Sequence, residues 1–144
     1  MKLHQLSLFI ENRPGQLTTP CKVLAEAGIN IVTLSLADTE QFGILRLLVC
    51  EWEAAKAALE KAGCVVNVTE VVAVEVKDQP GGMLEILEFI EKAELNIEYT
   101  YAFTERRGDK AVLIFRFDDP DRAIDALKAS PINIVAGVDL YKGA

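Results

Sequence analysis

The sequence contains the same short turn motif twice, 66 residues apart. When the chain is laid on itself with that shift, Pro14-Gly15 falls on Pro80-Gly81 and Asn30-Ile31 falls on Asn96-Ile97. Alternating apolar residues precede both Pro-Gly pairs. Internal self-similarity of this kind marks units that fold alike. We therefore predict that the 144-residue chain consists of two copies of about 70 residues, 1–69 and 70–144, rather than one domain.

Each copy has the pattern strand, helix, strand, strand, helix, strand. In the first copy, β-rich segments lie at 2–10, 30–38, 44–50 and 65–68, and helical spacing of apolar residues spans 17–27 and 52–62. Gly28 and Gly63 follow the two helical segments, where a left-handed residue often ends a helix. The second copy has expected strands at 71–76, 97–103, 112–117 and 134–140. This order predicts an α+β fold with two ferredoxin-like βαββαβ units in tandem, each an antiparallel sheet with helices on one face.

Local features leave two questions open. Pro20 would remove a backbone hydrogen bond inside the first helix, so either this helix begins near Thr18 or its first turn is distorted. The second strands of the two copies carry their apolar residues in opposite phase, which indicates either a bulge or a strand that is apolar on both sides. Two other features of the sequence give unambiguous predictions. Asp119-Pro120 predicts a capped helix start, and no linker separates the copies, so the strand at 65–68 is expected to continue into that at 71–76.

Charge and hydropathy exclude several classes of function. Fifteen basic and 22 acidic residues give a net charge of −7, whereas nucleic acids and anionic membranes require a basic surface. The apolar runs are far shorter than the roughly 20 residues that span a bilayer. The first residues lack the apolar segment of a signal peptide, so we expect a cytoplasmic protein.

The residues that usually perform catalysis or bind metals are scarce. The chain has one histidine, His4, and three cysteines without a C-x-x-C spacing, Cys21, Cys50 and Cys64. We expect the cysteines to be small buried hydrophobic residues. The sequence shows no signature of a nucleophile and base. It therefore predicts a protein that is not an enzyme, with no cofactor and no metal site.

The Pro-Gly turns are the most informative positions for function. A strand ends, the chain turns, and a helix begins at once, which leaves free backbone N–H groups that stabilise a carboxylate. Two residues before each proline, Asn12 and Asp78 offer oxygen atoms that can accept from an ammonium group. Together these groups would suit a free α-amino acid. The same turn also connects a strand to a helix when nothing binds, so a purely structural role stays open.

The two turns and their surroundings resemble the ACT domain. The resemblance rests on Glu11-Asn12-Arg13-Pro14-Gly15-Gln16-Leu17 followed by Ala25-Glu26-Ala27-Gly28-Ile29-Asn30-Ile31, and on Lys77-Asp78-Gln79-Pro80-Gly81-Gly82-Met83 followed by Leu95-Asn96-Ile97. It covers practically the whole chain. The resemblance implies that an amino acid or similar metabolite binds between the first loop of one domain and the second-strand region of its neighbour. Carried over by position, the implied ligand-binding residues are Asn12, Gly15, Gln16, Leu17, Asn30, Ile31, Asp78, Gly81, Gly82, Met83, Asn96 and Ile97. Independently of the resemblance, Asn30 and Asn96 also suit left-handed turns.

Three hypotheses follow for the function. The first is a regulatory protein that binds a small amino acid and forms a homodimer, because an isolated unit of this size would be marginally stable and leave apolar sheet surface open. The second is a regulatory subunit that docks onto a separate biosynthetic enzyme, with ligand binding secondary. The third is an enzyme on the same scaffold, which no constellation of residues supports.

The two copies are not chemically equal. Residues 1–69 carry six basic and seven acidic side chains, a balance of −1, whereas residues 70–144 carry nine and fifteen, a balance of −6. If one site is used, we favour that of Asp78, because a charge-assisted bond to an ammonium group is stronger than one from Asn12. The segment Arg106-Arg107-Gly108-Asp109 is expected to be a solvated hairpin tip without a binding role.

Overall fold

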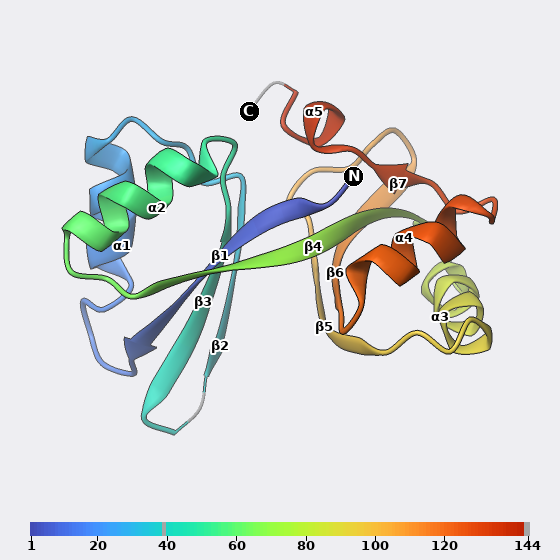
Figure 1. Ribbon diagram of the computed structural model, residues 1–144, viewed down its shortest axis with the longest axis horizontal. Coiled ribbons are helices and arrows are strands. Elements are labelled where there is room, and N and C mark those ends of the chain that lie inside the picture. Colours follow the sequence, from blue (N-terminus) through green and yellow to red (C-terminus); the bar gives the residue numbers. More distant parts are fainter. Residues whose placement is uncertain (39, 143–144) are drawn as a thin grey trace. The chain divides into compact units, whose positions relative to one another are not determined.

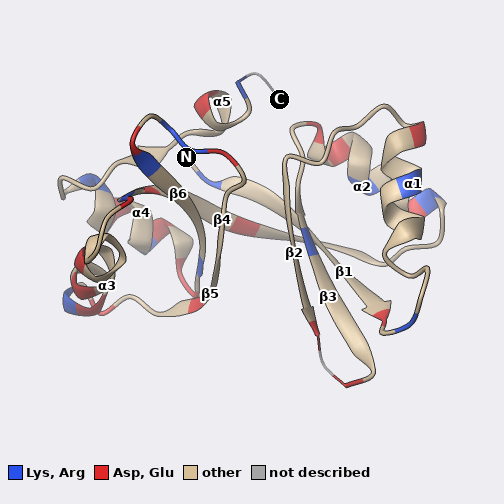
Figure 2. Cartoon of the chain, turned by 180° about the vertical axis from the view of Figure 1, so that it is seen from behind, with Lys and Arg blue, Asp and Glu red and all other residues tan. Residues whose placement is uncertain are grey.

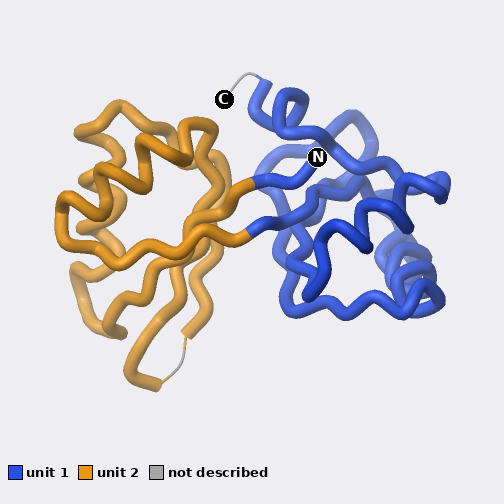
Figure 3. The backbone as a smooth tube through the Cα atoms, in the orientation of Figure 1, with its two compact units in different colours: residues 1–3, 70–142 blue, residues 4–69, 143–144 orange. Residues whose placement is uncertain are grey.

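The computed structural model describes residues 1–38 and 40–142. Backbone contacts divide them into two compact units, which Figure 3 distinguishes by colour. The N-terminal unit comprises residues 4–69, and the C-terminal unit comprises residues 1–3 and 70–142. Residues 143–144, the end of the expected second copy, lie outside the described residues.

The N-terminal unit has the expected βαββαβ order (Figure 1). Its elements are β1 (Leu3–Glu11), α1 (Thr18–Glu26), β2 (Thr33–Asp38), β3 (Phe42–Leu48), α2 (Trp52–Lys61) and the first part of β4 (Val66–Lys77). The strand order is β2-β3-β1-β4, and β3 pairs antiparallel with both β1 and β2. Leucines from alternate positions of β1 and β3 pack against Leu24 of α1 and against Ala55 and Leu59 of α2. Both helices therefore cover the same face of this sheet.

The C-terminal unit repeats this arrangement. It contains the rest of β4, then α3 (Gly82–Lys92), β5 (Ile97–Ala102), β6 (Lys110–Phe117), α4 (Pro120–Lys128), β7 (Ile134–Val135) and α5 (Gly137–Leu140). The strand order is β5-β6-β4-β7. Its core joins Val72, Val74 and Val76 of β4 and Phe115 and Phe117 of β6 to the buried faces of α3 and α4. The fold class expected from the sequence is thus confirmed.

Several local expectations are also confirmed. The first helix begins at Thr18, so Pro20 lies in its first turn, where proline is tolerated better than in the interior of a helix. The phase change between the second strands is a bulge between Ile97 and Tyr99. Asp119 caps α4, with its carboxylate accepting from the amide of Arg122 at 3.1 Å. The twelve residues of β4 run from one unit into the other without interruption.

Three expectations are wrong. The segment 134–140 forms only a two-residue strand, Ile134–Val135, and then the short helix α5, in which Leu140 is buried and Val138 is exposed. Cys50 is exposed, while Cys21 and Cys64 are half-buried. Asn30 and Asn96 are not left-handed. Among residues 1–38 and 40–142, the non-glycine residue with positive φ is Glu94.

Candidate ligand-binding site

The first loop, residues 12–17, lies beside the hairpin that joins β2 to β3. The amide of Asn12 donates to the carbonyl of Gln41 at 2.9 Å, and its side-chain amide donates to the carbonyl of Glu40 at 3.5 Å. Gly15 has a φ of +87°, a conformation that glycine adopts without strain. Both the amide and the hydroxyl of Thr19 donate to the Gly15 carbonyl at 3.4 Å, which starts α1.

A hollow of about 90 Å³ lies against this loop. Three implied ligand-binding residues line it: Asn12, Gln16 and Leu17. Its remaining walls are residues outside the implied ligand-binding set: Ile10, Glu11, Arg13, Leu36, Asp38 and Gly43. The strand order explains their presence, because β3 separates β1 from β2, so the start of β3 and the end of β2 lie beside the end of β1.

The second loop, residues 78–81, joins β4 to α3 and has the same geometry. Gly81 has a φ of +84° and stands at the N-cap of α3. Its carbonyl accepts from the amide of Glu85 at 3.0 Å. A Cβ atom at the next residue, Gly82, would lie 1.9 Å from the carbonyl oxygen of Lys77. The strand and the helix therefore approach so closely here that only glycine fits.

The hollow at the second loop is larger, about 590 Å³. Asp78 and Met83 line it among the implied residues, and the other walls are Val76, Lys77, Gln79, Pro80, Ala111 and Leu113. Small-molecule sites in proteins commonly measure ~300–1,000 Å³. The second hollow lies in this range and the first does not. An aliphatic wall beside a carboxylate matches a small amine with an apolar side chain.

The strand-start residues do not join either hollow. Thr33 pairs with Leu48 at one end of β3, whereas Glu11, at the first loop, pairs with Phe42 at the other end. At roughly 3.3 Å per residue, these ends are about 20 Å apart. Asn30 and Ile31 precede Thr33, so they lie far from the loop of their own unit. Asn96 and Ile97 are separated from the second loop in the same way, since Ile97 pairs with Phe117 and Lys77 with Lys110.

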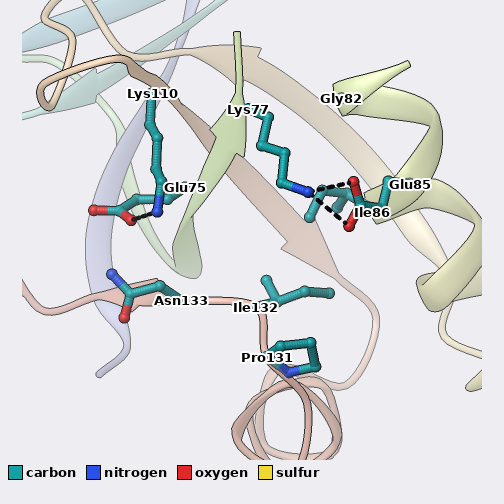
Figure 4. Close-up of a pocket in the computed structure, with 9 residues that line it drawn as sticks. All are labelled: Glu75, Lys77, Gly82, Glu85, Ile86, Lys110, Pro131, Ile132 and Asn133. Atoms are coloured by element: carbon teal, nitrogen blue, oxygen red, sulfur yellow. Dashed lines mark hydrogen bonds and ion pairs between the residues drawn. The ribbon is translucent and has the colours of Figure 1, made fainter. Parts of the chain in front are cut away.

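Another hollow, of about 150 Å³, opens where β7 leaves β4 (Figure 4). Continuing the register of these strands would place Pro131 opposite Lys77, and proline has no N–H to extend the ladder. Figure 4 shows Glu75 facing Lys110 on one side and Lys77 facing Glu85 on the other. The Glu85 carboxylate lies 3.1 Å from the Lys77 ammonium group. Ile86, Ile132 and Pro131 supply the apolar part of the wall.

Glu75 is the most enclosed charged group of this hollow. Its side chain is 12% exposed, and its carboxylate lies 3.1 Å from Nε of Arg107 and 3.5 Å from Nζ of Lys110. Burial alone would raise the pKa of Glu75, but hydrogen bonds from Asn133 and Arg107 and the charge of Lys110 lower it below its usual value. These contacts anchor the hairpin between β5 and β6 to β4.

Charged side chains and side chains of the types that bind metals also lie outside these hollows. Figure 2 shows acidic residues gathered on α3. Within 1–38 and 40–142, no cluster of three or more His, Cys, Asp or Glu side chains could hold a metal ion. His4 stacks on Trp52, with 4.5 Å between the ring centroids. No helix in the described part of the chain is long and apolar enough to cross a membrane.

Comparison with known proteins decides the family. A family model described as an ACT domain pair matches residues 1–143. The chain is a member of the ACT domain family. A crystal structure of protein BT0572 from Bacteroides thetaiotaomicron is 36% identical, with a TM-score of 0.91, over 99% of this chain and 97% of that one. No curated protein sequence matches this ACT domain pair.

More distant solved structures share the fold. The regulatory subunit of aspartate kinase from Thermus thermophilus is 20% identical with a TM-score of 0.64, over 88% of this chain and 89% of that one. The corresponding subunit from Thermus flavus is 17% identical with a TM-score of 0.60, over 88% and 90%. At these identities the likeness concerns the fold, and it agrees with the βαββαβ order of each ACT domain here.

Proposed function

We propose that this ACT domain pair is a non-catalytic regulatory protein that binds a free α-amino acid or a closely related metabolite. The observation that carries the proposal is the recurrence of a hollow at the same loop in both units, beside a left-handed glycine and a helix start. A turn needed only for folding would not require a lined hollow in each copy. The membership of the ACT family and the fold shared with regulatory subunits of aspartate kinase support the same proposal.

The second loop is the better candidate for the ligand. Its hollow has the volume of a small-molecule site, and Asp78 supplies a carboxylate for an ammonium group. Gly81 and Gly82, at the start of α3, are not among the residues that line this hollow. Val76, Met83 and Leu113 would contact the ligand side chain. The ligand is therefore expected to be an aliphatic amino acid.

The strand-start residues Asn30, Ile31, Asn96 and Ile97 would contribute to a site only from a neighbouring ACT domain, because they lie at the far end of the sheet from the loop of their own unit. The proposal includes a homodimer, in which a second copy of the chain supplies such a neighbour. Exposed apolar side chains support an interaction surface on the face of the N-terminal sheet that the helices leave open, where Phe9 of β1 is 62% exposed and Phe42 of β3 is 51% exposed.

The same surface supports a second candidate function, docking onto a separate amino-acid biosynthetic enzyme. In that case ligand binding would be secondary, and the exposed apolar residues would face the enzyme rather than a second copy. Affinity capture with the tagged chain separates the two candidates. Recovery of a biosynthetic enzyme, reduced by Phe9→Glu, would favour docking, whereas recovery of the chain alone would favour the homodimer.

Binding is tested by a thermal-unfolding scan with each of the twenty amino acids at millimolar concentration, followed by calorimetry. A ligand that binds the folded state raises the midpoint as its concentration rises. We expect an aliphatic amino acid to do so and Asp78→Asn to abolish the shift. Asn12→Ala is the matched variant in the first loop and should keep the shift. If no amino acid or related metabolite raises the midpoint, the proposal is wrong.

A further inference from the structure

The hairpin between β5 and β6 places a guanidinium group directly on the second loop. Arg106 forms an ion pair with the carboxylate of Asp78, which lines the larger hollow. Both side chains are accessible, with Arg106 62% and Asp78 48% exposed. From the sequence, Arg106 was expected at a solvated hairpin tip without a binding role. Residues 78 and 106 belong to separate loops, and nothing in the sequence indicates their contact.

The neighbouring residue fixes the tip of this hairpin. Arg107 donates from Nε to Glu75 at 3.1 Å and from Nη1 to the carbonyl of Asp139 at 3.2 Å. Its backbone also exchanges hydrogen bonds with that of Lys110, at 3.0 and 3.1 Å. The backbone that carries Arg106 is therefore anchored on two sides, while the Arg106 side chain itself reaches an exposed partner. A ligand can displace such a side chain without unfolding the hairpin.

The first copy makes the equivalent contact without charge. There the hairpin between β2 and β3 offers backbone carbonyls, of Glu40 and Gln41, to Asn12. The loop is held by amide–carbonyl hydrogen bonds in one copy and by an arginine–carboxylate pair in the other. Because the loops have the same backbone turn, this difference concerns what each loop can bind rather than how it folds.

We propose that Arg106 and Asp78 together bind the zwitterionic part of the ligand at the second loop. The guanidinium group of Arg106 takes the ligand carboxylate, and the carboxylate of Asp78 takes the ligand ammonium group. This inference rests on the proposed amino-acid-binding function and adds the groups that recognise the ligand backbone. Without ligand, the two side chains neutralise each other.

The energetics favour this exchange. An exposed ion pair contributes little to stability, so opening it costs little. A zwitterion then satisfies both groups with charge-assisted hydrogen bonds, and guanidinium binds carboxylate in a fixed, two-pronged geometry. A ligand that carries only an ammonium or only a carboxylate group would leave one partner of the broken pair without its counter-charge. The pair therefore selects zwitterions against amines and simple acids.

The test uses the full chain labelled with nitrogen-15 and three small probes: glycine, glycinamide and acetate. Glycine has both charged groups, glycinamide lacks the carboxylate, and acetate lacks the ammonium group. The amide signals of Gly81 and Gly82 report on the second loop, and that of Gly15 reports on the first. We expect glycine to shift the Gly81 and Gly82 signals at lower concentration than either of the other probes.

Arg106→Gln should weaken glycine binding about tenfold, as expected for one lost charge-assisted hydrogen bond, and should not weaken glycinamide binding, because Asp78 then has no ion pair to break. Asp78→Asn should weaken both glycine and glycinamide. Arg13→Gln is the matched control, because Arg13 pairs with Glu11 in the first loop, 2.6 Å apart, and it should not change the response of Gly81.

The outcomes separate this inference from the proposed function. If glycine or another amino acid shifts the second-loop signals equally in the wild type and in Arg106→Gln, the inference is wrong and the proposed function stands. Tighter binding in Arg106→Gln also overturns it, since Arg106 would then only compete with the ligand. If none of the twenty amino acids binds, both proposals fail.

Discussion

Two of the helices end on a glycine that the sequence identifies. After α1, the amide of Gly28 donates to Ala25 at 3.0 Å and that of Ile29 donates to Leu24 at 2.9 Å. These two bonds form the Schellman motif, which requires a left-handed residue at its centre. Gly28 has a φ of +70°, and Gly63 plays the same role after α2 with a φ of +90°.

The third helix ends in the same motif with a glutamate at its centre. After α3, the amide of Glu94 donates to Glu91 at 2.9 Å and that of Leu95 donates to Ile90 at 3.1 Å. Glu94 has a φ of +54°. A residue with a Cβ atom in this conformation costs roughly 1–2 kcal/mol, a cost that glycine does not have. The C-terminal unit therefore carries a local strain that the N-terminal unit lacks.

Replacing Glu94 with glycine should remove this strain. The gain is offset by about 0.4–1 kcal/mol, because glycine makes the unfolded chain more flexible. The net effect expected for Glu94→Gly is a stabilisation of about 0.5–1 kcal/mol. The reverse changes, Gly28→Ala and Gly63→Ala, should destabilise by about the same amount. A Cβ atom at either glycine has no heavy atom within 4 Å, so their cost is conformational alone.

Urea unfolding followed by circular dichroism measures all three variants against the wild type. For a chain of this size, the gain in Glu94→Gly corresponds to a rise of roughly 2–4 °C in the melting temperature. Glu94→Ala is the control for the side chain, since it removes the carboxylate but keeps the Cβ atom, and it should not stabilise. If Glu94→Gly lowered the stability, or Glu94→Ala raised it equally, the cause could not be the left-handed backbone.

Three further predictions concern the loop, the anchor of the hairpin and the assembly. Gly82→Ala should destabilise the protein by more than about 2 kcal/mol, because the added Cβ would lie 1.9 Å from the carbonyl oxygen of Lys77. In the same urea assay, Gly81→Ala should cost about 1 kcal/mol, because a Cβ there would have no heavy atom within 4 Å and only the left-handed backbone opposes it. Equal losses in the two variants would contradict the steric argument. Glu75→Gln should lose about 1–2 kcal/mol of stability at pH 7. Because the pKa of Glu75 is lowered in the folded state, its contribution is present above its unfolded pKa and is lost as the pH falls through its folded pKa, so the difference between variant and wild type should shrink as the solution is acidified. A difference independent of pH would refute this explanation. The chain should form dimers in light scattering, weakened by a charged residue at Leu34 or Tyr101, whereas a uniform species of 15.8 kDa at micromolar concentration would exclude the homodimer.

The element order could be predicted because each signal was local. Each element was indicated by residues close to one another in the sequence: a glycine after an apolar helical segment, a proline after an aspartate, or alternating apolar residues. The repeat could therefore be followed element by element. The secondary structure of residues 134–140 was harder to predict. In 134–140, apolar residues occur at alternate positions, as in a strand, yet only Ile134 and Val135 pair with β4, and Gly137–Leu140 form a short helix.

The walls of the candidate site could be predicted only in part for the same reason. Asn12 and Asp78 lie inside the repeated motif and were identified from it. Leu36, Gly43 and Leu113 reach the hollows through the strand order, which becomes informative only when the register of β3 and β6 is known.

The contact between Arg106 and Asp78 is a difference between the two copies that the repeated sequence motif does not reveal. Both copies have the same turn, and the residue two positions before the proline contacts the following hairpin in each. In the first copy that contact joins uncharged groups, and in the second it joins a cation to an anion. If the contact served only to hold the hairpin, the uncharged version would suffice, because an exposed ion pair adds little stability. A charged pair beside the larger hollow is better explained by a ligand that carries both charges.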